Sequence, residues 1–195
     1  MSKRILIVQG HPDASQAHLC HALARAYSEG AEAGGHEIRS VDLGRLDFPL
    51  LRSAKEWSEG RLPASLQPAQ ESIAWAEHMV IFFPLWLGDM PALVKGFLEQ
   101  VARPGFAFSG DGANPFGKKG LKGRSARIVV TMGMPALVYR FYFRAHSVRS
   151  LERNVLGFVG IAPVNETLIG TAEALDEKTR NRWFGKLKAL GRDAL

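Results

Sequence analysis

The sequence contains a single cysteine, Cys20, among 195 residues, so no disulfide can form within the chain. This usage is typical of reducing compartments and favours a cytoplasmic location. Long apolar runs are missing as well. The longest, Met79 to Leu87, contains Pro84 and is too short to cross a bilayer. The apolar run after Lys3 and Arg4 is too short for a signal peptide, so we expect a cytoplasmic protein with no membrane span.

Several catalytic signatures are also absent. No G-x-G-x-x-G follows the first apolar run, which argues against a dinucleotide-binding Rossmann domain. No G-x-S-x-G is present, so a Ser-His-Asp hydrolase has no motif support. His18, Cys20 and His21 lie close together, but on a helix Cys20 points away from the face that the two histidines share. Because a structural zinc site usually needs four ligands, we expect no metal.

The charge balance is basic, with 25 Lys and Arg against 19 Asp and Glu and a net charge of +6. A positive field favours anionic ligands such as phosphates, or an anionic membrane surface. No aromatic-interleaved basic stripe and no helix-turn-helix pattern accompanies it, and the basic residues from Lys118 to Arg127 are interpreted as a solvated loop. We therefore expect no nucleic-acid partner.

Short apolar segments alternate with segments of helical periodicity. The predicted strands are residues 4–8, 37–43, 79–83, 126–132 and 163–169. Asp89 is expected to cap the helix after the third strand, and residues 44–68 and 103–124 are expected to be mostly loop. Each right-handed crossover between parallel strands needs a helix. The pattern therefore predicts an α/β, flavodoxin-like fold: one domain over residues 1–195, with a five-stranded parallel sheet in the order 2-1-3-4-5 and helices on both faces.

Ligands of such sheets bind at the carboxyl ends of the strands, so the loops there are candidate sites. The first, GHPDASQAH, opens a helix, whose free N–H groups attract phosphate. The Ser15 hydroxyl and the rings of His11 and His18 add donors. The alternative interpretation is a polar turn in which the serine caps the helix.

The other two loops are candidates for holding a flat heterocycle. In PLWLGDMP, Trp86 can stack on a ring while free backbone amides bond its edge; the alternative is core packing for Leu85 and Leu87, with Trp86 partly buried. The loop TMGMPALVY leaves its strand through Gly133 and can line the other side of the same ring, or form an ordinary strand-to-helix turn.

These segments together resemble the NAD(P)H dehydrogenase (quinone) family of flavodoxin-like oxidoreductases. The resemblance is carried by GHPD with Ser15 and His18, by FPLWLGDMPALVKGFLEQVARPGFAF and by VVTMGMPALVY; it covers most of the chain and is most specific from Phe82 to Phe108. It implies a two-electron quinone reductase that holds FAD, or FMN, and is usually a homodimer. In that family the flavin accepts hydride from NAD(P)H, the oxidised nicotinamide leaves, and the acceptor takes its place over the same ring face.

The resemblance also assigns roles to individual residues. His18 stands where relatives often have asparagine, and Met132 and Met134 replace a threonine and a glycine in a loop that often reads T-T-G-G. Tyr139 and His146 resemble the tyrosine and histidine that face the flavin, and are the expected catalytic residues. The expected cofactor-binding residues are His11, Ser15 and His18 for the phosphate, Pro84, Leu85, Trp86 and Leu87 for the ring edge, Phe106 as an aromatic near the ring, and Thr131, Met132, Gly133 and Met134.

The function predicted from the sequence is that of an enzyme, a flavin-dependent NAD(P)H:quinone oxidoreductase whose acceptor is a quinone or a similar flat molecule. Nitro and azo compounds stay open as acceptors, as does the choice between NADH and NADPH. A second interpretation is a flavodoxin-type electron carrier, which the basic charge fits poorly. A third is a flavin- or nucleotide-binding regulatory module for a membrane partner such as an ion-efflux system, and this role is compatible with the first.

The aromatic-rich stretch Tyr139 to Phe143 is too apolar to sit comfortably in water beside Arg140 and Arg144. We interpret it as a homodimer contact with the flavin near the interface. The alternatives are packing within its own domain and a peripheral membrane contact, in which the arginines meet lipid phosphates.

Overall fold

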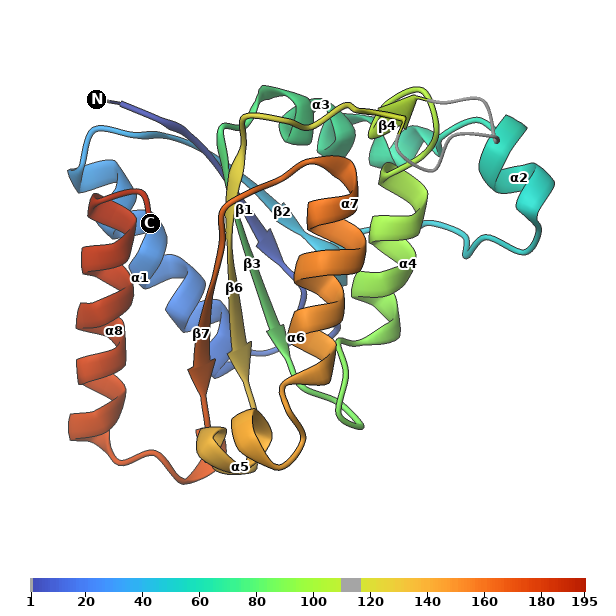
Figure 1. Cartoon of the computed structure of the whole chain (residues 1–195). Coiled ribbons are helices and arrows are strands. Elements are labelled where there is room, and N and C mark those ends of the chain that lie inside the picture. The colour runs from blue at the N-terminus through green and yellow to red at the C-terminus, as the bar shows by residue number, and fades with distance from the viewer. Residues whose placement is uncertain (1, 110–116) are drawn as a thin grey trace.

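The computed structural model describes residues 2–109 and 117–195 of the chain. At its centre lies a parallel sheet whose strands run in the order β2-β1-β3-β6-β7 (Figure 1). The strands are β1 (Arg4–Gln9), β2 (Glu37–Asp42), β3 (His78–Pro84), β6 (Ser125–Thr131) and β7 (Val164–Ile169). Counted within this sheet, the order is the predicted 2-1-3-4-5. Every pairing is parallel, so the carboxyl ends of all these strands meet at one edge.

Burial within the sheet follows the sequence pattern. Every residue of β3 is buried, and β1 and β6 are buried except at their ends, which is what continuous apolar runs predict for strands covered on both faces. The outer strand β2 is exposed or half-buried throughout. The central strands therefore anchor the fold, and their loops leave from a rigid base.

Helices cover both faces of the sheet, as predicted (Figure 1). On one face, α1 (Leu19–Ala33) and α8 (Glu177–Arg192) pack together over the side chains of Ile5, Ile7 and Val80. On the other face, α3 (Gln67–Trp75), α4 (Ala92–Val101) and the segment α6–η3–α7 cover Leu6, Ile81 and Ile128. The two sets of strand residues alternate, since successive side chains of a strand point to opposite faces. The third segment is one helical stretch, made of α6 (His146–Ser150), η3 (a π-helix, Leu151–Leu156) and α7 (Gly157–Val159).

Local residues account for two of the helix ends, and the one predicted helix cap is wrong. Helix α1 ends at Gly34, and Asp176 caps α8 by accepting a hydrogen bond from the Thr179 N–H at 2.7 Å. The expectation that Asp89 caps α4 is wrong: α4 begins after Pro91 with no side-chain cap. Asp89 is held further back in the loop, where its carboxylate accepts from the Met90 N–H at 2.6 Å.

Short elements complete the structure. The predicted loop 44–68 is mostly irregular but contains α2 (Ala54–Glu59) and η2 (Ala64–Leu66), and η1 (Leu43–Arg45) overlaps its start. The predicted loop 103–124 contains an antiparallel pair, β4 (Phe108–Ser109) with β5 (Lys118–Lys119). Helix α5 (Ala136–Phe141) follows β6, and η4 (Ala172–Ala174) follows β7. None of the helices within residues 2–109 and 117–195 combines the length and apolarity that crossing a membrane requires.

Candidate active site

A cleft of about 360 Å³ opens at the carboxyl edge of the sheet. It is bounded by the loops after β1, β3 and β6, which the sequence marked as candidates, and by η4 from the loop after β7, which sequence reasoning missed. The signal was available, because a strand that joins the sheet in parallel must end at the same edge. The lining residues are His11, Ala17, His18, Leu19, Cys20, Pro84, Leu85, Trp86, Thr131, Met132, Gly133, Ala172 and Glu173.

The expected site residues fall into three groups. His11, His18, Pro84, Leu85, Trp86, Thr131, Met132 and Gly133 line the cleft together. Ser15, Leu87 and Met134 belong to the same loops but lie outside the lining. Phe106, Tyr139 and His146 are elsewhere in the chain and do not line this cleft.

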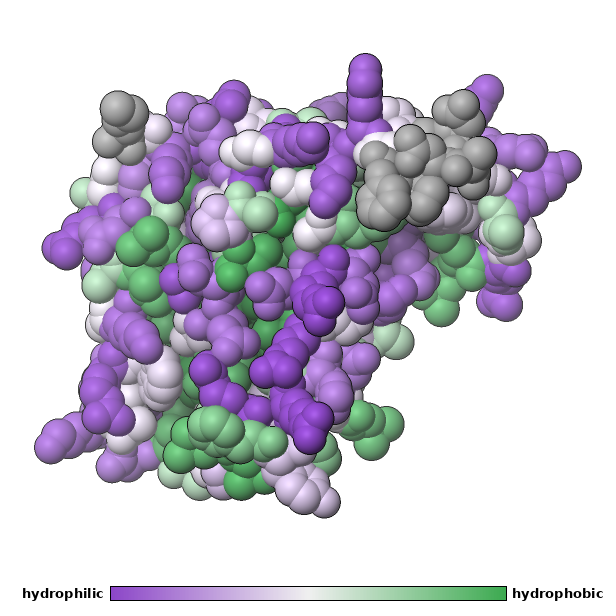
Figure 2. Space-filling view, in the orientation of Figure 1, coloured by the Kyte–Doolittle hydropathy of each residue, from purple (hydrophilic) through white to green (hydrophobic). Residues whose placement is uncertain are grey.

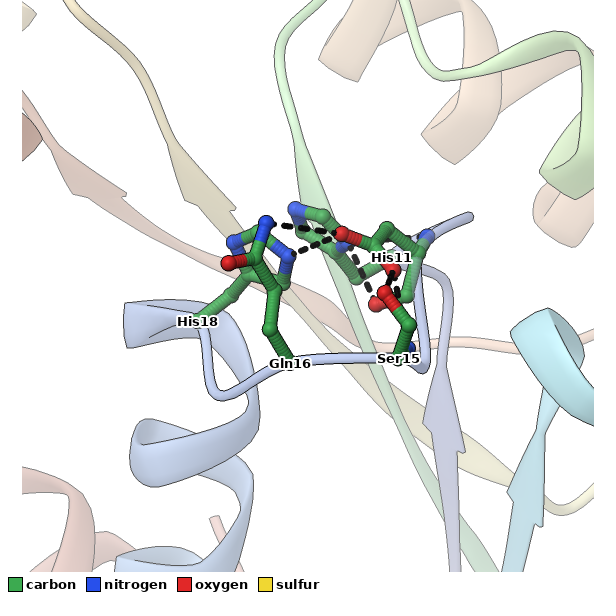
Figure 3. A network of polar contacts seen from close by, with 5 residues as sticks. His11, Ser15, Gln16 and His18 are labelled. Atoms are coloured by element: carbon green, nitrogen blue, oxygen red, sulfur yellow. Dashed lines mark hydrogen bonds and ion pairs between the residues drawn. The ribbon is translucent and has the colours of Figure 1, made fainter.

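A dense polar network in the β1–α1 loop includes His11, Ser15, Gln16 and His18 (Figure 3). The Asp13 carboxylate is the common partner of its hydrogen bonds. The Asp13 carboxylate accepts hydrogen bonds from the Ser15 N–H at 2.8 Å and hydroxyl at 2.5 Å, and from the Gln16 amide at 3.0 Å. It also contacts Nε2 of His18 at 2.9 Å. These donors hold the pKa of the Asp13 carboxyl far below its usual range, the Ser15 hydroxyl most of all. The loop is therefore built to stabilise a negative charge.

Three histidine rings gather beside this carboxylate. The rings of His11 and His18 stack with centroids 3.7 Å apart, and His21 lies 5.3 Å from His11 and 5.7 Å from His18. Burial lowers the pKa of His11, and the two neighbouring rings lower it further. An anion bound here would oppose that effect, because a nearby negative charge favours the protonated ring. Within the described part of the chain, no group of three or more His, Cys, Asp or Glu is arranged to hold a metal ion.

The interpretation of Ser15 as a helix cap is wrong. Helix α1 begins at Leu19, its N-cap residue is His18, and no side chain caps it. Ser15 is bound to Asp13 instead, in the turn expected when an Asp carboxylate bonds the backbone two residues on. The start of α1 thus faces the cleft with its amide dipoles uncapped by a side chain, which suits an anionic ligand.

The β3–α4 loop makes a tight turn at Leu87 and Gly88, which both have positive φ, 49° and 82°. Trp86 and Asp89 bond each other's backbone across this turn, and the Leu85 N–H donates to the Thr131 carbonyl at 2.8 Å. The expectation of free amides is therefore wrong for Leu85 and Trp86. The turn instead projects side chains: Trp86 is half exposed beside His11, and Leu87 stands fully in solvent.

The β6–α5 loop leaves open backbone at Gly133. A Cβ built on this glycine meets no atom within 4 Å. Met132 is buried and Met134 is half-buried, and both pack into the core below α4 and α6. The two methionines that replace a threonine and a glycine of the resembled motif therefore do not cover the Gly133 backbone, and a flat group can approach it.

The two expected catalytic residues lie beyond this loop. Tyr139 is 1% exposed, its hydroxyl is 3.4 Å from the Val148 N–H, which donates to it, and burial raises the pKa of that hydroxyl. His146 is exposed at the start of α6. Between them the chain turns sharply at Arg144 and Ala145, both with positive φ. In this conformation neither residue reaches the cleft, so their catalytic role stays a prediction.

A second hollow surface runs along α4. A cavity of about 610 Å³ is lined by apolar residues of α2, α4, β4 and the η3–α7 segment, including Trp57, Leu98, Phe108 and Phe158. A neighbouring hollow of about 500 Å³ is lined by Trp86, Leu87 and Met90, among others, and shares Lys95 and Val155 with the first. Together they form an apolar trough from β4 to the β3–α4 loop. Phe106 lies two residues before β4 in the chain. Strand β4 lies at the end of the sheet opposite to α5 (Figure 1).

Comparisons with known proteins agree with the fold described above. A family model described as flavodoxin-like fold matches residues 3–189. This chain belongs to the flavodoxin-like fold family. An NAD(P)H:quinone oxidoreductase from Methanothermobacter marburgensis has a similar structure, with a TM-score of 0.82, 23% identity and coverage of 100% of this chain and 98% of that one. At this identity the likeness shows the fold.

Curated relatives of this flavodoxin-like chain share about a quarter of its residues over the aligned segments. It is 28% identical over 155 residues to the ribosyldihydronicotinamide dehydrogenase-like protein traD of Penicillium crustosum, covering 67% of this chain but only 57% of that protein. It is 25% identical over 197 residues to an FMN-dependent NADH:quinone oxidoreductase of Macrococcus caseolyticus, covering 90% of each.

Proposed function

We propose that the chain is a single-domain flavoenzyme that oxidises NAD(P)H and reduces a quinone or a similar flat acceptor by two-electron transfer. The observation that carries the proposal is that one cleft combines two chemically different walls. The β1–α1 loop provides hydrogen-bond donors that surround a negative charge. The loops after β3 and β6 provide an apolar wall with accessible backbone at Gly133. A flavin has the same division, a phosphate end and a flat ring. The relatives named for quinone reduction support the choice of reaction.

The residues present fit such a cofactor at both ends. The Ser15 and His18 donors bind the Asp13 carboxylate, so a cofactor phosphate would share or take over these donors. His11, buried against His18, would hold the phosphate with them. Trp86 beside His11 and the open backbone at Gly133 would hold the ring between them. Pro84, Leu85 and Thr131 complete the floor of the cleft.

A bound flavin supplies hydride acceptance and donation, and the chain supplies binding, orientation and charge stabilisation. Hydrogen-bond donors held where negative charge develops lower the barrier of such a step. Tyr139 and His146 are our proposed donors, on the family resemblance. Both lie on the segment that follows the cleft wall, so engaging the ring requires the turn at Arg144 and Ala145 to shift.

The proposal includes a homodimer and a cytoplasmic location. The apolar trough along α4 ends at Phe108 of β4 on one side and at Trp86 on the other, and Phe106 lies two residues before Phe108. In a two-fold contact over this face, each chain would present its β4 end to its partner's Trp86 end, because such interfaces are self-complementary. That arrangement would bring Phe106 near a ring it cannot reach within one chain. The one cysteine, buried and unpaired, suits a reducing compartment.

Identification of the released cofactor tests the proposal most directly. Purified protein is denatured and the released flavin is identified by chromatography; we expect FAD, with FMN the alternative that the FMN-dependent relative supports. NADH and NADPH oxidation is then measured with quinones, nitro compounds and azo dyes. Flavin without NAD(P)H oxidation would identify an electron carrier, and no flavin at all would overturn the proposal.

A further inference from the structure

Exposed apolar side chains are concentrated at one tip of the molecule. Among the described residues, ten large hydrophobic side chains are exposed, and five of them belong to the seven-residue segment 137–143. We call this group the α5 tip: Leu137, Val138, Phe141, Tyr142 and Phe143. Leu137, Phe141 and Tyr142 are 69%, 73% and 79% exposed. Figure 2 shows the hydrophobic atoms gathered at the lower edge, over the position of α5 in Figure 1.

The tip is held in place by the fold. Tyr139, in the middle of the segment, is buried and anchors α5 to the core. The carbonyl of Val138 accepts from the backbone N–H groups of Tyr142 and Phe143, and the rings of these two residues contact each other edge to face at 4.9 Å. The apolar groups therefore project from a fixed base. Apolar surface gathered in this way marks a contact site.

The surroundings of the tip are cationic. Residues 131–151 contain three arginines and no aspartate or glutamate. Arg140, Arg144 and Arg149 are all exposed. Arg140 is paired with Glu166, whereas Arg144 and Arg149 show no ion pair with any described residue. Asp89 of the β3–α4 loop accepts a hydrogen bond from the Ser147 hydroxyl. Exposed aromatic and aliphatic side chains on a segment with exposed arginines match an anionic lipid surface, whose headgroups attract the charges while its acyl boundary receives the rings.

We propose that the α5 tip docks the protein on an anionic bilayer, with Phe141 and Tyr142 inserted at the headgroup boundary and Arg144 and Arg149 against lipid phosphates. A second copy of the chain is the less suitable occupant. Arginines on both copies would face each other across a two-fold axis, and the trough along α4 already offers a hollow, mostly apolar face for that contact.

Docking through this tip has a consequence for the substrate. The tip continues the β6–α5 loop, which forms one wall of the cleft, so the cleft and the tip share the carboxyl edge of the sheet. The acceptor would then be a lipid-dissolved quinone that enters from the bilayer. This second step rests on the proposed function, whereas the docking itself does not.

Vesicle sedimentation tests the docking. Full-length protein with its bound cofactor is mixed with vesicles of phosphatidylcholine, and with vesicles in which about a third of the lipid is phosphatidylglycerol. We expect at least tenfold stronger binding to the anionic vesicles and a loss of binding as salt screens the charges. F141S/Y142S and R144E/R149E should each weaken binding to anionic vesicles at least tenfold. Equal binding of the wild type to both vesicles, or none to either, would overturn the proposal.

Matched variants elsewhere on the surface control for folding and for net charge. Leu195→Ser removes a half-exposed apolar side chain, and K178E/R182E makes the same charge change on α8; both should bind vesicles as the wild type does. The alternative occupant of the α5 tip is a second copy of the chain, and the oligomeric state of F141S/Y142S, measured by light scattering, tests it. A dimer that becomes a monomer in this variant would assign the tip to the dimer interface and overturn lipid docking.

Turnover separates the docking from the proposed function. With a hydrophilic quinone in solution, F141S/Y142S should keep the wild-type rate. With a long-chain quinone in anionic vesicles, its rate should fall about tenfold while Leu195→Ser keeps it. Vesicle binding without turnover of any quinone would overturn the proposed function and leave the docking intact. Equal loss with both quinones would overturn the role of the tip in delivering the substrate.

Discussion

The β1–α1 loop and the β6–α5 segment both border the cleft but differ in the side chains that they present. The loop presents polar groups, whereas the segment buries a polar group and exposes apolar ones. The first points its donors at a carboxylate, Asp13, and keeps the rings of His11 and His18 stacked behind it. The second buries the hydroxyl of Tyr139 and exposes the rings of Phe141 and Tyr142. The first segment thus gathers its polar groups at the cleft, whereas the second carries its exposed apolar rings outside the cleft lining.

Within the cleft, the donors of the β1–α1 loop face the apolar wall of the loops after β3 and β6, and this division suits an amphipathic cofactor better than a sugar or a peptide. Charge-assisted donors hold one end strongly and with direction. Apolar contacts do not fix the direction of a flat ring as hydrogen bonds do. Different flat rings can therefore bind in turn on the same apolar surface. Of the four predictions that follow, three test the two segments and one tests the fold that carries them, from the largest expected effect to the smallest.

The strongest test of the polar side is Ser15→Asp. It adds a second carboxylate where Asp13 already stands, so a cofactor phosphate meets like charge instead of a donor. We expect flavin affinity to fall tenfold or more, since one unit charge at contact distance is worth about 1–4 kcal/mol between bulk water and the protein surface. Titration of the apoprotein measures it. Ser58→Asp, the same change on the exposed α2, should keep full affinity. Unchanged affinity in both variants would exclude this loop as the phosphate site.

The pH response of the fold must be known before any pH response of the cleft histidines can be interpreted. His78, on the opposite edge of the sheet, is 1% exposed, and burial lowers its pKa to about 4. The unfolded chain protonates this ring near 6.5, so its contribution is present above pH 6.5 and is lost between about 6.5 and 4, roughly 3 kcal/mol in all. About 2 kcal/mol of this should be lost between pH 7 and 5 in urea unfolding. His78→Gln should flatten that slope, and an unchanged slope would exclude His78 as its cause.

The apolar side is tested by Tyr139→Phe. If Tyr139 turns to the ring as a donor, flavin reduction should slow roughly tenfold to a hundredfold in stopped-flow measurements, with flavin content unchanged. His146→Gln should slow it similarly. Tyr142→Phe removes the same atom from an exposed ring nearby and should have no effect. Tyr139→Phe should also cost about 1 kcal/mol of stability, because the Val148 N–H loses its acceptor. Wild-type rates with that stability loss would make the tyrosine purely structural.

Gly133→Ala gives the smallest expected change and the most local one. The added methyl meets no atom of the chain within 4 Å, so stability should change by less than about 0.5 kcal/mol. A ring packed on this backbone would be pushed away, and we expect a several-fold loss of flavin affinity. Gly185→Ala on α8 also enters open space and should stabilise the helix slightly without affecting the cofactor. Equal affinity in both variants would place the ring away from Gly133.

The sequence predicted the fold well because its signals are local. Runs such as RILIV and MVIFF fixed the buried strands, and the helical spacing between them fixed a parallel sheet, from which the meeting of the three loops follows. The parallel strand β7 ends at the same edge of the sheet, so the loop after it, which contains η4, also reaches the cleft.

The remaining features depend on side-chain conformations that no local pattern encodes. The Asp13 network requires four donors to converge after the loop has folded. Tyr139 is buried because the chain reverses at Arg144 and Ala145, and positive φ at such residues has no sequence signal. Phe106 shares a motif with residues of the site but is separated from them by the length of α4.

Cys20 lines the cleft behind the β1–α1 loop, is 3% exposed, and has its thiol pKa raised to about 12 by burial. Such a thiol is almost inert while the loop is closed, because the thiolate is the reacting form and the reagent cannot reach it. The rate at which an alkylating agent modifies it therefore reports how often the loop opens. Cys20 is the only cysteine of the chain, so the alkylation rate of the whole protein is the rate at this one site. A cofactor bound over Cys20 should lower that rate.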